Sequence, residues 1–213
     1  MNKQFLAILL VIFIALFGVF TLTKDKEDNG SNNSNTSVQP SNHVKGKTDS
    51  KVTLTEYGDF QCPACKSYYP IVKELSESYG DKVQFQFRHF PLVQIHPNAF
   101  VASRAAEAAG KQNKFFEMHD QLYENQDIWS TATNPNSYFE GYASQLGLNL
   151  DQFKSDMTSE AVSDQINADL KAGQALKANS TPTFAINGKK IEKNPQSIDE
   201  FKKLLDDELA KNQ

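Results

Sequence analysis

The sequence contains very few cysteines: Cys62 and Cys65, three positions apart, are the only two in 213 residues. A framework of structural disulfides needs several pairs, so that class of small secreted fold is excluded. No other thiol is present that could exchange with a bond between these two. No cysteine follows the N-terminal apolar run either, which excludes a bacterial lipoprotein anchor.

An excess of positive charge is also absent. The chain has 22 Lys and Arg against 26 Asp and Glu, for a formal net charge of −4, and the two signs are mixed along its length. Without a basic stripe, nucleic acid is not an expected partner. The sequence shows no internal repeat, so it predicts a globular domain and not a repeat array.

One long hydrophobic run lies at the N-terminus, from Phe5 to Leu22, and no charge interrupts it. As a helix it would rise about 27 Å, close to the hydrocarbon thickness of a bilayer. A cleaved signal peptide is the alternative, but Phe20 and Leu22 stand where its small exit residues should be. We therefore expect an uncleaved single-pass signal-anchor over residues 1–23, with Lys3 inside and the rest of the chain outside the cytoplasmic membrane.

Residues 24–47 are rich in Asn, Ser, Gly and Lys and contain no aromatic residue. Such a composition cannot bury enough apolar surface to offset the entropy of ordering, so this segment is predicted to be a flexible tether. Residues 48–213 are numerous enough for one well-buried domain.

Hydrophobic periodicity predicts the order of elements in that domain. Residues 51–60 and 82–90 alternate as strands, and the segment between them, from the cysteines to Gly80, has helical spacing. A strand–helix–strand order predicts a parallel pair. Residues 97–178 are helical throughout. Two strands joined by an Asn187-Gly188 hairpin turn follow over 181–191, and a helix capped by Ser197 and Glu200 closes the chain.

The Cys-x-x-Cys pair, within FQCPACKSYY, admits three interpretations. A structural disulfide would close a very short loop and would stabilise the fold by only about 2 kcal/mol. A zinc site would need two further ligands, and His89 and His96 lack the paired spacing of such a site. The third is redox catalysis, which we favour because the pair stands where a strand meets a helix.

The N-terminus of a helix favours negative charge, so the pKa of Cys62 is expected to fall and its thiolate to be the attacking species. Cys65, one turn deeper, is expected to be the shielded resolving thiol. Pro63 occupies a first-turn position where its missing N–H costs nothing.

The chain resembles the DsbA-like thiol–disulfide oxidoreductases of the thioredoxin superfamily. The likeness covers roughly residues 48–210 and rests on YGDFQCPACKSYYP (57–70), RHFPLVQIHPNAFVASRAAEAAGKQNKFFEMHDQLYENQ (88–126) and STPTFAINGKKI (180–191). It implies an α/β thioredoxin-like fold (β-α-β / β-β-α), formed by residues 48–95 and 179–213, with an inserted all-helical domain over residues 96–178. We expect no metal and no cofactor.

The resemblance also implies a cis peptide bond before Pro182, in a loop facing the cysteines. The exposed backbone of Thr181 would then pair with an extended substrate strand. Pro63, Ala64, Thr181 and Pro182 are the expected substrate-binding residues.

Glu56 is the third expected catalytic residue. It shares a strand face with Val52 and Leu54, so its carboxylate is expected to be buried and its pKa raised. It resembles the family's buried acid, which would move protons for the resolving thiol. The alternative is a glutamate at the strand's end that reaches water.

Ala64 is a departure, because strong oxidants of the family often carry His at this position. A histidine can stabilise the Cys62 thiolate and alanine cannot, so we expect a less depressed pKa and a less oxidising disulfide.

The expected function is that of a membrane-tethered oxidase, which introduces disulfides into newly exported or unfolded cysteine-containing proteins. The location supports this direction, because disulfides persist outside the cytoplasm. The family implies a membrane quinone-linked partner that reoxidises the pair. The alternatives are a reductase or isomerase with the same site, and a non-redox peptide-binding chaperone. The aromatic content of the helical insertion suggests that it shapes a hydrophobic substrate groove, and the alternative is that it simply covers the edge of the active site; these residues are Phe100, Phe115, Phe116 and Trp129.

Overall fold

The fold is described from a computed structural model, which places residues 38–211. The predicted signal-anchor over residues 1–23 lies outside this range. Among the helices within it, none is both long enough and apolar enough to cross a membrane.

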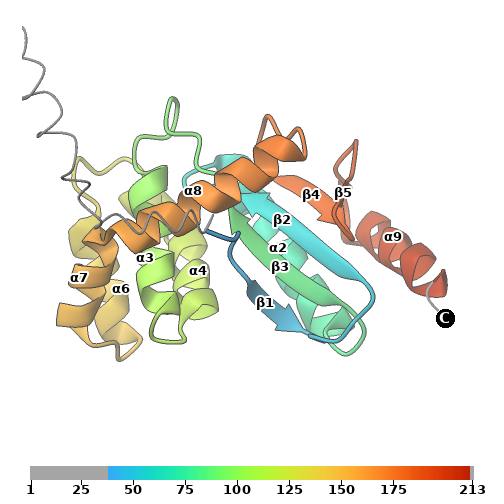
Figure 1. The fold of residues 1–213 in the computed structure, drawn as a ribbon, viewed down its shortest axis with the longest axis horizontal. Coiled ribbons are helices and arrows are strands. Elements are labelled where there is room, and N and C mark those ends of the chain that lie inside the picture. The colour runs from blue at the N-terminus through green and yellow to red at the C-terminus, as the bar shows by residue number, and fades with distance from the viewer. Residues whose placement is uncertain (1–37, 212–213) are drawn as a thin grey trace, which may run out of the picture. The chain divides into compact units, whose positions relative to one another are not determined.

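A five-stranded mixed sheet forms the centre of the domain, in the order β1-β3-β2-β4-β5 (Figure 1). Its central pair, β2 and β3, is parallel as predicted, and the other three pairings are antiparallel. The strand bounds are β1 His43–Gly46, β2 Thr53–Gly58, β3 Gln84–His89, β4 Thr183–Ile186 and β5 Lys189–Lys190.

The tether prediction is wrong at its C-terminal end, because β1 lies within residues 24–47. Its sequence, His-Val-Lys-Gly, is too short and polar to show a strand pattern. The strand forms because its backbone pairs with the edge of β3, from His43 opposite Phe87 to Gly46 opposite Gln84. The compact domain therefore begins before residue 48.

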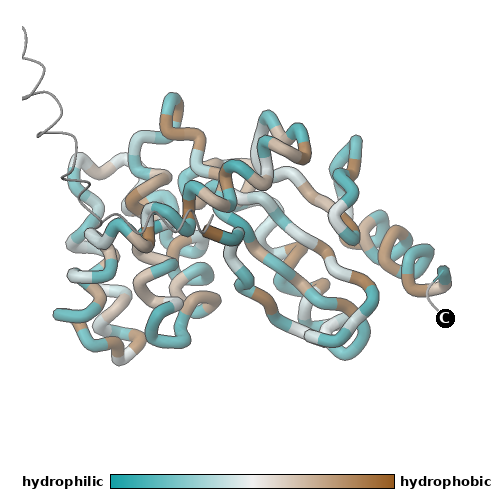
Figure 2. The backbone as a smooth tube through the Cα atoms, viewed as in Figure 1, coloured by the Kyte–Doolittle hydropathy of each residue, from teal (hydrophilic) through white to brown (hydrophobic). Residues whose placement is uncertain are grey.

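Helices α2 (Pro63–Tyr79) and α9 (Ile198–Ala210) pack on one face of the sheet. Leu75 of α2 and Phe201 of α9 are fully buried there, beside sheet residues such as Phe85. Figure 2 shows hydrophobic and hydrophilic residues alternating along α9, as expected of a helix with one buried side. The predicted N-cap is present, since Ser197 Oγ accepts a hydrogen bond from Glu200 N at 3.3 Å.

The helical region between β3 and β4 is inserted into this core, as predicted. Its bounds are α3 Ala99–Gly110, α4 Phe115–Glu124, α5 Gln126–Trp129, α6 Asn136–Gln145, α7 Leu150–Thr158 and α8 Glu160–Ala175. The alanines of α3 allow close packing of its neighbours around it. Met118, Phe139 and Phe153 fill the space between these helices.

Helix α8 lies across the sheet face opposite α2, and one glycine permits its close approach. A Cβ atom at Gly173 would lie 2.5 Å from the Phe90 ring and 3.0 Å from the Tyr57 ring. The hairpin between β4 and β5 turns at Asn187 and Gly188, with φ of 50° and 74°, as the sequence predicts.

Candidate active site

The two cysteines lie at the start of helix α2, shortly after the end of strand β2. Cys62 is the N-cap residue and Pro63 takes the first helical position. Both cysteines are free thiols here. Cys62 is 7% exposed and Cys65 is fully buried, whereas Pro63 and Ala64 face solvent. One sulfur therefore lies near the surface and the other beneath it.

The pKa of the Cys62 thiol is lowered to about 5. The largest cause is a hydrogen bond from the Cys65 thiol, followed in favour of the thiolate by hydrogen bonding with Thr181 and with the backbone N–H groups of Cys65 and Ala64. Burial acts in the opposite direction. The direction agrees with the sequence prediction, but the neighbouring thiol contributes more than the helix start does.

Cys65 has the opposite tendency. Burial, its hydrogen bond to Cys62 and the charge of Glu56 all raise the pKa of the Cys65 thiol well above its usual value. Among the principal causes, only the backbone N–H of Asp59, which donates to the sulfur at 3.5 Å, lowers the pKa of Cys65. Because the two pKa values are shifted in opposite directions, Cys62 can form a stable thiolate while Cys65 remains protonated.

The loop before β4 faces the outer sulfur. The peptide bond between Thr181 and Pro182 is cis, as the resemblance implied. The Cys62 thiol donates a hydrogen bond to the Thr181 carbonyl at 3.5 Å, and both loop residues are buried. Asn194 Nδ2 donates to the Pro182 carbonyl at 2.7 Å and anchors the loop from behind. The structure thus brings residues 119 positions apart into one site.

Glu56 lies within β2 and is 5% exposed, so it does not reach water at the strand's end. Its Oε1 atom is buried without a hydrogen-bond partner in the described structure. Burial is the largest cause that raises the pKa of this carboxyl to about 8, and Lys45 opposes it. The carboxyl is therefore protonated near neutral pH.

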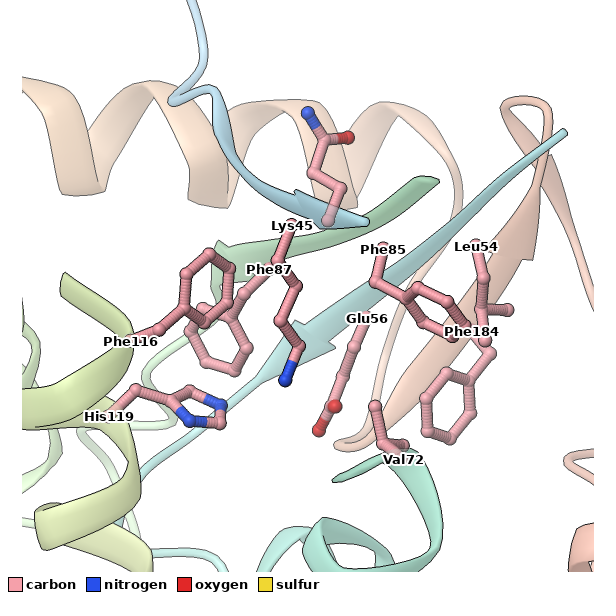
Figure 3. A pocket seen from close by; sticks show the side chains of 10 residues that line it. Lys45, Leu54, Glu56, Val72, Phe85, Phe87, Phe116, His119 and Phe184 are labelled. Atoms are coloured by element: carbon pink, nitrogen blue, oxygen red, sulfur yellow. The ribbon is translucent and has the colours of Figure 1, made fainter. Parts of the chain in front are cut away.

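A small cavity of about 20 Å³ adjoins this carboxyl, lined by residues that include Glu56, Lys45, His119 and Phe116. That volume holds about one water molecule. In Figure 3 the Lys45 ammonium lies between the Glu56 carboxylate and the His119 ring. Burial lowers the pKa values of both Lys45 and His119. The cavity thus groups three titratable side chains, of which Glu56 acts electrostatically on the resolving thiol.

Sequence reasoning missed Lys45, because it lies in the segment assigned to the tether. It also missed Asp59, which is fully buried and accepts hydrogen bonds from Gln61 N, Leu92 N and His96 Nδ1 at 2.7 to 2.9 Å. The Gly-Asp before the cysteines looked like a simple strand end. The local sequence does not distinguish an aspartate that only caps a turn from one that hydrogen-bonds to three separate segments.

Helix α5 contributes a third missed residue, Gln126. Its side-chain amide donates to the carbonyls of Phe60 at 2.6 Å and Cys62 at 3.0 Å. These bonds tie the loop that carries Cys62 to the helical insertion. A buried glutamine 64 positions from the cysteine carries no sequence signal for this role.

The aromatic residues of the insertion do not form the expected groove together. Trp129 is fully buried, packs edge-on against Phe139, and donates from Nε1 to the Leu122 carbonyl at 2.8 Å. Phe115 is 5% exposed and belongs to the same core. Phe100 lines two surface pockets and the half-buried Phe116 lines the cavity beside Glu56, so packing accounts for Trp129 and Phe115 but not for all four aromatic residues.

Neither cysteine belongs to a cluster of three or more potential metal ligands in residues 38–211. The cluster found there consists of His43, His89 and Glu107. His96 and His119 instead contact Asp59 and Asp120, respectively.

Comparison with known proteins agrees with this architecture. Residues 38–207 match a family model described as thioredoxin. BdbD from Bacillus subtilis, solved in its oxidised form, is 28% identical; the superposition covers 82% of this chain and 97% of that one, with a TM-score of 0.69. Wolbachia pipientis α-DsbA1 shares the fold at 20% identity, with a TM-score of 0.69 over 85% of this chain and 97% of that one.

A curated relative, Na(+)/H(+) antiporter NhaA 1 of Mycolicibacterium gilvum, is 38% identical over 152 residues. The match covers 70% of this chain but only 24% of that longer protein, so the antiporter name describes much more than the matched, thioredoxin-like part. Family model, fold and site agree, and the chain belongs to the DsbA-like thiol–disulfide oxidoreductases of the thioredoxin superfamily.

Proposed function

We propose that this chain is an oxidase that transfers the Cys62–Cys65 disulfide to cysteine-containing substrate proteins. The observation that carries the proposal is the opposed electrostatics of the two thiols. The pKa of Cys62 falls to about 5, whereas that of Cys65 is raised. A stabilised Cys62 thiolate favours the reduced enzyme, and an enzyme whose reduced form is stable is a stronger oxidant.

The reaction begins when a substrate thiolate attacks the Cys62 sulfur of the oxidised enzyme. A substrate–Cys62 bond forms, the Cys62–Cys65 bond breaks, and Cys65 leaves with the electron pair. With its raised pKa, the Cys65 thiolate then takes up a proton, and the buried carboxyl of Glu56 is the proposed donor. Glu56 acts here on the resolving thiol and does not touch the substrate.

In the second half, another substrate thiolate attacks the substrate sulfur of the mixed disulfide. Cys62 leaves as the thiolate, which its low pKa makes a good leaving group. The substrate has lost two electrons and the enzyme has gained them. Return to the disulfide needs a two-electron oxidant, and a quinone-linked membrane protein is the proposed partner.

The substrate is proposed to lie along the Thr181-Pro182 loop and to contact the exposed Pro63 and Ala64. The Thr181 carbonyl already accepts a hydrogen bond from Cys62, so an extended peptide at this edge would pass directly beside the reactive sulfur. Newly exported or unfolded chains present such extended, unpaired segments.

The site of action is proposed to be the outer side of the cytoplasmic membrane, with residues 1–23 as a single-pass anchor. The uninterrupted apolar run from Phe5 to Leu22 supports this placement. Compartments outside the cytoplasm are also where newly made disulfides persist.

Thiol trapping tests the proposal directly. A Cys65→Ser variant of the full chain keeps Cys62 but lacks the resolving thiol, so it should accumulate mixed disulfides with substrate proteins. The matched Cys62→Ser variant should accumulate none and should fail to support disulfide formation in the cell. Substrate folding that is unchanged by Cys62→Ser would refute the redox function and leave peptide binding as the activity.

Equilibration of the purified chain with glutathione buffers tests the direction of transfer. A potential near −120 mV, the value of a strong oxidant, supports the oxidase. A potential near −270 mV, that of thioredoxin, would refute it in favour of a reductase.

A further inference from the structure

Three potential metal ligands from three separate elements converge outside the redox site. His43 of β1 and His89 of β3 both direct Nε2 at the same oxygen of Glu107, which lies on α3. The distances from Oε1 are 2.7 Å to His43 Nε2 and 2.9 Å to His89 Nε2. All three ligand atoms lie within 4.8 Å of one another.

The packing around these side chains holds the imidazole rings in place. The His43 ring stacks on Phe115, with centroids 3.5 Å apart and planes 6° from parallel. The His89 ring meets Phe87 and Phe115 edge-on at 5.5 Å and 5.7 Å. A ligand set ordered by the folded protein loses little further entropy when it binds an ion.

The backbones that carry the two histidines are also fixed to one another. Asp169 is fully buried and accepts hydrogen bonds from Ser41 N and Ser41 Oγ, each at 2.6 Å, and from His89 N at 2.9 Å. One carboxylate thus joins the segment before β1 to the end of β3. The spacing between the histidines follows from this link.

Two imidazole nitrogens and one carboxylate oxygen are a ligand set suited to zinc, which leaves a fourth position for water. Calcium and magnesium prefer oxygen ligands alone and are less suited. We propose that His43, His89 and Glu107 form a binding site for a divalent transition-metal ion of the zinc type.

The site needs only a small adjustment to accept the ion. Tetrahedral bonds of about 2.0 to 2.1 Å place neighbouring ligand atoms roughly 3.3 Å apart. The two histidine–glutamate separations, 2.7 Å and 2.9 Å, are shorter than this by roughly half an ångström, and the ion would push Glu107 Oε1 away from the two nitrogens by about that amount. His43 can yield, because it lies on an edge strand and its side chain is 19% exposed.

The surroundings also provide room for the fourth ligand. Glu107 lines a groove of about 300 Å³, together with residues such as Lys111, Asp164 and Gln165. The buried Nδ1 atom of His89 has no hydrogen-bond partner in the described structure, whereas its Nε2 atom donates a proton to Glu107 Oε1 at 2.9 Å. An ion therefore has to displace that proton from Nε2 before it can bind there.

An ion at this position would join β1, β3 and α3. It would clamp the edge strand, which follows directly on the N-terminal segment, to both the sheet and the helical insertion. This role is structural and does not depend on the redox function, since neither cysteine takes part.

Zinc titration of the full chain tests the site. The protein is first oxidised so that Cys62 and Cys65 cannot act as ligands, and zinc binding is measured by competition with a chromophoric chelator. The expected result is one zinc ion per chain and a higher melting temperature with zinc than without. His43→Asn and Glu107→Gln should each weaken binding at least tenfold.

His96→Asn is the matched control, because His96 also contacts a buried carboxylate, Asp59, at 2.7 Å but lies outside the cluster. It should bind zinc as the unmodified chain does. Failure of the unmodified oxidised chain to bind one equivalent would overturn the proposal whatever the variants do. So would undiminished binding by His43→Asn, the partly exposed variant, with the metal-free melting temperature unchanged.

Discussion

Introducing a histidine between the cysteines, as Ala64→His, should make the disulfide more oxidising. Ala64 faces solvent in the first turn of α2, so an imidazole can be added there without displacing the core. The principal causes that lower the pKa of Cys62 are all hydrogen bonds, and no cationic side chain of the described residues ranks among them. An imidazolium would therefore add an interaction that this site lacks.

The size of the effect follows from Coulomb's law. At about 6 Å, two unit charges attract by about 0.7 kcal/mol in water and by about 2.8 kcal/mol at an effective dielectric constant of 20. Stabilising the thiolate by this amount lowers the pKa of Cys62 by roughly 0.5 to 2 units. The thiolate belongs to the reduced enzyme, so the reduction potential should rise by roughly 15 to 60 mV. The lower end is favoured, because the helix N-terminus repels a cation.

Two assays check this prediction. The ultraviolet absorbance of the thiolate as a function of pH gives the pKa of Cys62, and equilibration with glutathione near pH 6, where histidine is charged, gives the potential. Ala64→Gln is the control, since glutamine has similar length and no charge. An unchanged or higher pKa in Ala64→His would refute the reasoning, as would an equal shift in Ala64→Gln.

Two further substitutions test the buried residues. The pKa of about 8 for the Glu56 carboxyl means that the folded chain holds a proton which the unfolded chain, with a value near 4.5, releases. This contribution to stability is full below about pH 4.5 and is lost as the pH rises towards 8, so Glu56→Gln should gain a few kcal/mol over the unmodified chain between those values in urea unfolding. An advantage that is independent of pH would contradict the burial argument. Gly173→Ala should destabilise the fold by about 1 to 3 kcal/mol, because its Cβ would lie 2.5 Å from the Phe90 ring. Gly141→Ala, where a Cβ meets nothing within 4 Å, should not. Equal melting temperatures for these two variants would count against the close packing of α8.

The core of the domain could be predicted from the sequence because the patterns that indicate its elements are local. The alternation of residues in 51–60 and 82–90 predicted β2 and β3, and the dipeptide Asn187-Gly188 predicted the β4–β5 turn. Edge strand β1 was not predictable, because its four residues have no periodic pattern of their own. They become a strand only when β3 offers them unpaired backbone groups.

The candidate site divides in the same way. The sequence alone determined the position of the two thiols, since two residues three apart at a helix start must lie together whatever the rest of the chain does. The burial of Glu56 also followed from strand alternation, because side chains on one face share its environment.

Only the tertiary structure decided what surrounds these residues. Lys45 interacts with Glu56 from β1, a strand that forms only by pairing with β3. Gln126 hydrogen-bonds the Cys62 carbonyl from a helix 64 positions further along the chain. Thr181 contacts Cys62 although the two are 119 positions apart. The sign of each thiol's pKa shift depends on which dipoles and charges lie within a few ångströms of it. Within one helix or strand, spacing along the chain determines which groups lie close together. Between different elements, only the packing of the whole domain determines it.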